Sequence, residues 1–207
     1  MKRYIRSSRA DSSFMRQLVE TAFNSVSDPD ASYINIIKEL NQVFETKGIT
    51  LERTDGSGQY KYGDVAIKQS YFADDMRIYI EVADDFFETN ENQLDYLVRV
   101  LSQIYVHEKK HMDQFIAKGG YLTDEDASEG AYHSLWYEIE AHAADAVEGF
   151  IQNGYDPRQV LEDNLWEDWG IDVESAWIYW DTYGRYDDQL DCPVWQAFLK
   201  SFEESLY

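Results

Sequence analysis

The chain has 207 residues, of which 44% are hydrophobic and 15% aromatic, so it can bury a core and is not expected to be disordered. Its net charge of -22 disfavours binding to nucleic acids or anionic membranes through phosphate neutralisation. A single cysteine, Cys192, excludes an intramolecular disulfide and is compatible with a reducing compartment. No apolar run is long enough to span a bilayer, and the basic N-terminus lacks the apolar segment of a secretory signal, so we expect an intracellular protein or one released only by lysis.

The acidic residues are concentrated in the second part of the chain. From Tyr121 to Tyr207 there are 21 acidic and three basic residues, a net charge of -18, whereas the first 120 residues have a net charge of only -4. Such an excess is typical of a solvated, self-repelling surface. It also suits a basic protein partner or mimicry of the charge of a nucleic acid.

The apolar pattern predicts helices at both ends of the chain and a small sheet between them. A helical period recurs until Gly48, alternation with a period of two follows, and the helical period then returns near residue 90. We expect a single α+β domain that is mostly helical, with a basic tail at 1–11, a core at 12–152 and an acidic, Trp-rich helical extension at 153–207. The expected elements are helices at about 13–26 and 28–48, three strands near 49–51, 65–67 and 77–82, helices at about 90–119 and 131–152, and two or three helices after 156 with a break near 183–184.

A metal-binding pattern, HEKKH, occupies residues 107–111 of the long helix expected at 90–119. Positions four apart share one face of a helix, so His107 and His111 can reach a single ion. Glu108 falls beside that ion, where a carboxylate can take a proton from metal-bound water. Helical angles place all three on or beside the apolar face and turn Lys109 and Lys110 outward.

The third ligand has three candidates on the helix expected at 131–152, namely Glu138, Glu140 and His142. Helical angles place Glu140 at the centre of the apolar face, between Val147 and Ala144, where a lone carboxylate is costly and a divalent cation removes the cost. Glu138 and His142 fall on the opposite face and read as a solvated pair. The facing therefore favours Glu140.

His133 lies on the same predicted face as Glu140, two turns earlier. It can stabilise an oxyanion or bind substrate, or it can be a satisfied core histidine, and the sequence leaves these alternatives open. Tyr137, one turn away, has the same alternatives.

HEKKH followed by EIEAHAAD on a later helix resembles the gluzincin branch of the zincin metallopeptidases. The resemblance implies a zincin-like core over about 30–152, with Zn²⁺ held by His107, His111 and Glu140. It also implies that the strand at 77–82, as a free edge, pairs with an extended peptide substrate. The layout is similar to uncharacterised zinc peptidases of tailed bacteriophages, which implies a location in the host cytoplasm or the virion.

We accordingly expect a zinc metallopeptidase that acts on a peptide or protein, with Glu108 and His133 as candidate catalytic residues. The alternative is a zincin scaffold without activity, serving as an acidic protein-binding or virion structural protein. Neither the substrate nor the role of the acidic region follows from the sequence.

Overall fold

The structure is a computed structural model that describes residues 13–21, 33–53, 61–62, 65–72, 77–82, 94–119, 132–185 and 191–207. The described residues form two compact units, Ser13–Leu101 and Ser102–Tyr207, which we call the N-terminal and C-terminal units. Their boundary lies within the long helix α3 (Leu94–Ala117), whereas we expected a division between core and extension near residue 152. The expected tail at 1–11 lies outside the described residues.

The N-terminal unit contains a small four-stranded sheet with the order β1-β4-β3-β2, where the pattern predicted three strands. β1 and β4 run parallel, and the other neighbouring strands are antiparallel. Gly48 adopts a φ of 76° after the second helix, and its carbonyl accepts a hydrogen bond from the amide of Ile78 at the start of β4. The elements are a helix over 13–21, α2 (Tyr33–Glu45), β1 (Ile49–Arg53), β2 (Lys61–Tyr62), β3 (Val65–Phe72) and β4 (Ile78–Val82).

The strand that precedes the HEKKH helix is an interior strand. β4 pairs with β1 on one side and with β3 on the other, so that Ile78 lies between Ile49 and Phe72. A peptide can extend a sheet only at an unpaired edge. The expectation that this strand offers a free edge to a substrate is therefore wrong.

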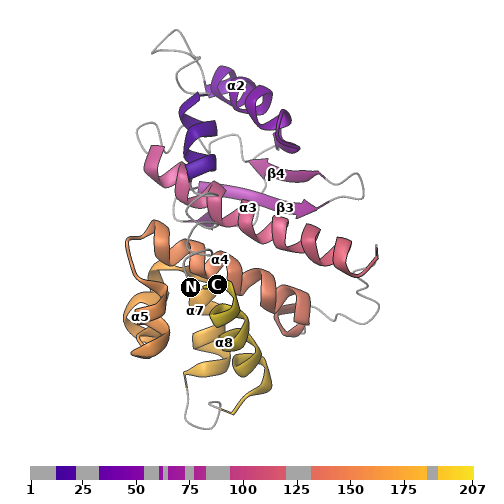
Figure 1. Cartoon of the computed structure of the whole chain (residues 1–207). Helices are drawn as coiled ribbons and strands as arrows, with labels where there is room; N and C mark the ends of the chain where they lie inside the picture. Colours follow the sequence, from indigo (N-terminus) through magenta and orange to yellow (C-terminus); the bar gives the residue numbers. More distant parts are fainter. Residues whose placement is uncertain are drawn as a thin grey trace. The chain divides into compact units, whose positions relative to one another are not determined.

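The C-terminal unit is helical in all its described elements (Figure 1). α7 and α8 lie side by side along α4, and α5 lies at one end of them. No helix in the described part of the chain combines the length and apolarity that a membrane span requires. Beyond α3, the elements are the 3-10 helix η1 (Tyr132–Ser134), α4 (Trp136–Gln152), α5 (Pro157–Glu162), α6 (Trp166–Trp169), the 3-10 helix η2 (Gly170–Asp172), α7 (Glu174–Tyr179), the π-helix η3 (Trp180–Gly184) and α8 (Pro193–Ser205).

Local signals explain where these helices begin and end. Gly154 has a φ of 82° just after α4, a conformation that favours glycine. The Asp156 side chain accepts a hydrogen bond from the amide of Arg158 and so caps α5, which begins with Pro157. The region after residue 156 contains more and shorter helices than the two or three that we expected.

Aromatic side chains form the core of the C-terminal unit. Phe198 stacks on Tyr179 with ring centroids 4.5 Å apart, and Trp166 meets Phe202 edge to face at 4.9 Å. The Trp-rich segment therefore supplies most of the core against which α4 packs. The large buried side chains of this cluster are Phe150, Trp166, Tyr179, Trp180, Trp195, Phe198 and Phe202.

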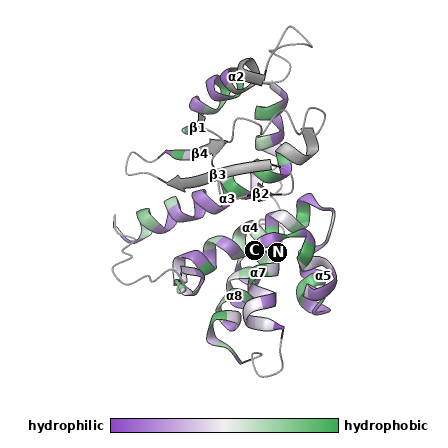
Figure 2. Cartoon of the chain, turned by 180° about the vertical axis from the view of Figure 1, so that it is seen from behind, coloured by the Kyte–Doolittle hydropathy of each residue, from purple (hydrophilic) through white to green (hydrophobic). Residues whose placement is uncertain are grey.

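α4 is buried on two faces. Eleven of its 17 residues are buried, more than one apolar stripe can supply. Ile139, Ala143 and Phe150 belong to the aromatic core, whereas Glu138 and Asp145 are buried on another face. Figure 2 shows the mixture of hydrophilic and hydrophobic residues along this helix.

Gly184 ends η3 against the indole ring of Trp195. A Cβ atom at this position would lie 2.6 Å from Trp195 Cε2 and 3.0 Å from Trp180 Cε3. Because both rings are buried, we expect Gly184→Ala to lower the free energy of unfolding by about 1–3 kcal/mol, measured by urea denaturation. Gly170→Ala is the matched control, since its Cβ would meet nothing closer than 3.9 Å, and equal stability of the two variants would contradict the prediction.

Candidate metal centre

α3 turns its HEKKH motif inward. Glu108 is 4% exposed and His111 8% exposed, and the side chain of His107 is 12% exposed. Lys109 instead forms an exposed ion pair with Asp113 at 2.8 Å. The expectation that His107, Glu108 and His111 lie on or beside the buried face is confirmed. Lys109 points outward as expected, whereas Lys110 is half-buried and pairs with Glu140.

α4 presents a polar face to these histidines. Glu138, His142 and Asp145 follow one another at helical spacing, and the first and last are 4% and 8% exposed. The expectation that Glu138 and His142 form a solvated pair is therefore wrong. The carboxylate and imidazole groups of α4 are buried because they meet the imidazoles of α3.

Two imidazoles and one carboxylate converge at a single point. His107 Nε2 lies 3.1 Å from His111 Nε2 and 3.5 Å from Glu138 Oε2, and His111 Nε2 lies 3.4 Å from Glu138 Oε1. Ligand atoms about 2.0–2.1 Å from a tetrahedral zinc ion are separated by about 3.3 Å. The three separations therefore fit three ligands of one such ion, and these residues form a candidate metal group.

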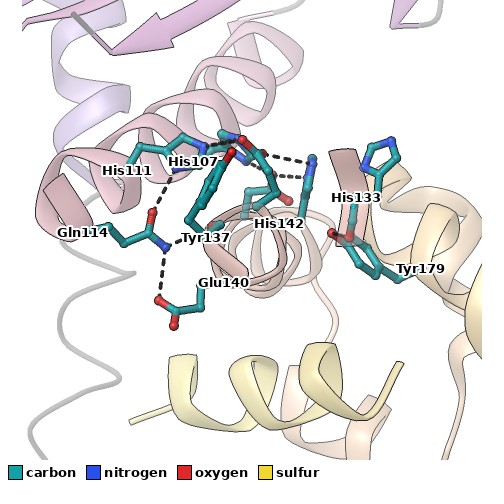
Figure 3. Close-up of polar contacts among 10 residues, drawn as sticks. His107, His111, Gln114, His133, Tyr137, Glu140, His142 and Tyr179 are labelled. Atoms are coloured by element: carbon teal, nitrogen blue, oxygen red, sulfur yellow. Dashed lines mark hydrogen bonds and ion pairs between the residues drawn. The ribbon is translucent and has the colours of Figure 1, made fainter. Parts of the chain in front are cut away.

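A separate acceptor holds the second nitrogen of each imidazole. His107 Nδ1 donates to Asp145 Oδ2 at 2.9 Å, and His111 Nδ1 donates to Gln114 Oε1 at 3.0 Å. The orientation of the Gln114 amide is determined because its nitrogen donates to the Tyr137 carbonyl and to Glu140, as Figure 3 shows. With its proton on Nδ1, each imidazole can offer the lone pair of Nε2 to a metal ion beside Glu138.

The ionisation of these groups reflects their mutual contacts. Burial lowers the pKa of His107, but hydrogen bonds to Asp145 and Glu138 outweigh it and raise the pKa to about 10. Burial likewise opposes ionisation of Glu138, but hydrogen bonds from His107 and His111 hold its pKa below the ordinary value. Without an ion, a proton on His107 compensates these carboxylates, and a divalent cation can displace that proton.

The Glu140 carboxylate contacts Gln114 and Lys110 and forms no ion pair with His107 or His111 among the described residues. This carboxylate accepts a hydrogen bond from Gln114 at 3.1 Å and forms an ion pair with Lys110 at 3.4 Å, and the Glu140 side chain is 34% exposed. It lines a cleft of about 370 Å³ between α4 and α8 with Trp136 and Lys200. The geometry therefore does not support Glu140 as the third ligand, because its face of α4 turns toward α8.

The remaining candidate residues lie beside the metal group. The pKa of the Tyr132 phenol is raised by burial and by the charges of Glu138 and Glu108, so both carboxylates lie close enough to act on this phenol. The His133 ring lies 5.3 Å from the His142 ring, measured between centroids, and the His133 carbonyl accepts a hydrogen bond from Tyr179. His133 therefore borders the cluster and belongs to neither candidate metal group.

The sequence analysis missed two residues of this site, Asp145 and Gln114. Asp145 lies two turns after Glu138, on the same face of α4, and Gln114 lies one turn after His111 on α3. Their spacing was the available signal, since imidazole ligands need acceptors for their second nitrogens.

Comparison of the chain with protein-family models, with curated proteins and with solved structures finds no match. The functional conclusion therefore depends on the geometry of the site and on the HEKKH motif.

Proposed function

We propose that the chain is a zinc-dependent peptidase in which His107, His111 and Glu138 hold the ion. The observation that carries the proposal is that their ligand atoms lie 3.1–3.5 Å from one another. In addition, Nδ1 of each imidazole donates a hydrogen bond to a separate acceptor. Glu138 thus takes the place first given to Glu140. The likeness of HEKKH to the gluzincins supports peptide bonds as the substrate class, and a zincin core belongs to the same proposal.

The donor set favours a catalytic zinc over a structural one. Structural zinc sites have four protein ligands, usually with cysteine, whereas catalytic sites have three and leave a fourth position for water or substrate. Two histidines and a glutamate match the catalytic set. The lone cysteine, Cys192, lies at the start of α8 and in neither candidate metal group.

Each neighbouring residue has a role in the proposed reaction. Bound zinc would lower the pKa of a coordinated water molecule and polarise the carbonyl of the substrate. Glu108 accepts a proton from water and later passes it to the leaving amine. Asp145 and Gln114 keep the imidazoles in the tautomer that binds metal. His133 borders the site and is a candidate for contacting the substrate.

Metal analysis of freshly purified protein tests the site. We expect one tightly held zinc ion per chain, removed by a strong chelator, and cleavage of a labelled-peptide library that stops with the chelator and resumes when zinc is restored. Protein that retains no transition metal at neutral pH would contradict the metal centre. Protein with zinc but no cleavage at any peptide would contradict the peptidase.

The acidity of the chain supports a second candidate function. The net charge of -18 after residue 120 favours binding of a basic protein, such as a virion component or a nucleic-acid enzyme, with the zinc site serving only for stability. Such binding weakens steeply as salt increases, whereas peptide hydrolysis at the metal centre does not require it. The chain can be passed over immobilised basic proteins at increasing salt concentration. Capture that is lost at high salt would support the binding function, and capture that is indifferent to salt would count against it.

A further inference from the structure

The first ion leaves two neighbouring metal-binding side chains unused. All four histidines of the chain gather around this site, but only His107 and His111 belong to the group with Glu138. The ring of His142 lies 4.6 Å from that of His107, measured between centroids. His142, Asp145 and His107 form a second candidate group whose ligand atoms lie within 4.8 Å of one another.

Buried polar atoms of this second group lack hydrogen bonds. Three of its buried atoms have no hydrogen-bond partner among the described residues. They are both ring nitrogens of His142 and Oδ1 of Asp145. Asp145 as a whole is only 8% exposed. Buried carboxylate and imidazole groups usually have partners, because desolvation without one is costly. These atoms are therefore available to bind a ligand.

The charge of the pocket points to a cation. Glu138 and Asp145 are both buried, and the ion pairs that they form are with the imidazoles of His107, His111 and His142. Within the part of the chain that the structure describes, no lysine or arginine forms an ion pair with Glu138 or Asp145. A buried negative charge needs a proton or a cation beside it.

We propose that His142 and Asp145, with His107 beside them, form a second position for a divalent transition-metal ion. His142 Nδ1 lies 3.4 Å from Oδ2 of Asp145, whose Oδ1 lacks a hydrogen bond, and His142 Nε2 lies 3.9 Å from Glu138 Oε2. Figure 3 shows the His142 ring beside that of His107. The inference rests on the proposed first site, because His107 and Glu138 take part in both.

The two proposed positions should differ in their affinity for a metal ion. Asp145 keeps Oδ2 for the hydrogen bond from His107 Nδ1 and has Oδ1 for the second ion. The second ion therefore has only His142 and Asp145 as ligands that the first ion does not use. We expect it to bind at least about tenfold more weakly than the first, because it has fewer protein ligands and lies near a like charge.

Titration of the full-length, metal-free protein with Zn²⁺, followed by native mass spectrometry, tests the second position. We expect two ions per chain in the parent, with the tight step intact and the weak step absent in His142→Ala. His133→Gln is the control, since its ring borders the cluster without belonging to either group, and it should still take two ions. Retention of the tight ion by His142→Ala also shows that this variant has folded.

Each other outcome is decisive. A parent that binds one ion overturns the second position and leaves the proposed function standing, with His142 then compensated by a proton. A parent that binds none overturns both. Two ions in His142→Ala show that the weaker ion lies elsewhere and also overturn the second position.

Discussion

Glu138→Gln is expected to abolish stoichiometric zinc binding, whereas Glu140→Gln should bind zinc as the parent does. Both changes keep the size of the side chain and remove its charge, and the two positions are separated by one residue on α4. Of these two carboxylates, that of Glu138 lies within 3.5 Å of both imidazole Nε2 atoms, whereas that of Glu140 contacts Gln114 and Lys110. Loss of a protein ligand should weaken binding by about 100-fold or more, since loss of a supporting acceptor alone costs 10–100-fold.

Competition against a chromophoric zinc chelator measures both affinities. His111→Ala should behave like Glu138→Gln, because it removes another of the three ligands. Thermal unfolding of each variant without metal checks that the fold is retained. If Glu140→Gln loses the ion while Glu138→Gln keeps it, the third ligand is Glu140, as the sequence pattern favoured, and the proposed role of Glu138 is excluded.

The local features of the fold were predictable from the sequence. The ends of α2, α3 and α4 coincide with Gly48, Gly119 and Gly154, all of which have a positive φ. A helical period places His107, Glu108 and His111 on the inner side of α3. These predictions succeed because helix termini and the facing of residues on one helix depend on interactions within a few residues.

The third ligand was not predictable by the same means. The angles around α4 separate Glu138 and Glu140 correctly, but the polar face was expected in solvent. Periodicity cannot distinguish a polar face in water from one buried against complementary groups, because the distinction lies in the partner helix. Here the partners are His107 and His111, about 30 residues earlier in the chain, and they make burial of Glu138 and Asp145 favourable.

The order of the strands in the sheet could not be predicted from the sequence, for a related reason. Alternation identified the strand at Ile78–Val82, yet its two neighbours come from distant segments, Ile49–Arg53 and Val65–Phe72. The pleat shows which side chains share a face and does not show which strand lies at an edge. The interior position of β4 removes the free edge at which a peptide substrate was expected to pair.

Glu108→Gln is expected to keep the tightly bound zinc and to lower the rate of peptide hydrolysis by about 10²–10⁴-fold, the range that general acid–base catalysis supplies. Glu108 belongs to neither candidate metal group, so its replacement leaves the ligands in place. Glutamine has nearly the same shape but cannot take a proton from water. Hydrolysis of a fluorogenic peptide identified by the library measures the change, and zinc analysis of the same sample shows that the metal is present.

Lys109→Ala is the control for this variant, because Lys109 is the next residue of HEKKH and its side chain is 41% exposed. It should leave both zinc and hydrolysis unchanged. Unaltered hydrolysis by Glu108→Gln would exclude Glu108 as the base, and Asp145 and His142 would be the next groups to test, since they lie on the same side of α4 as Glu138. Loss of zinc from Glu108→Gln would instead mean that the buried charge of Glu108 stabilises the ion, and the base would have to be sought again among the groups that remain ionised once zinc is bound.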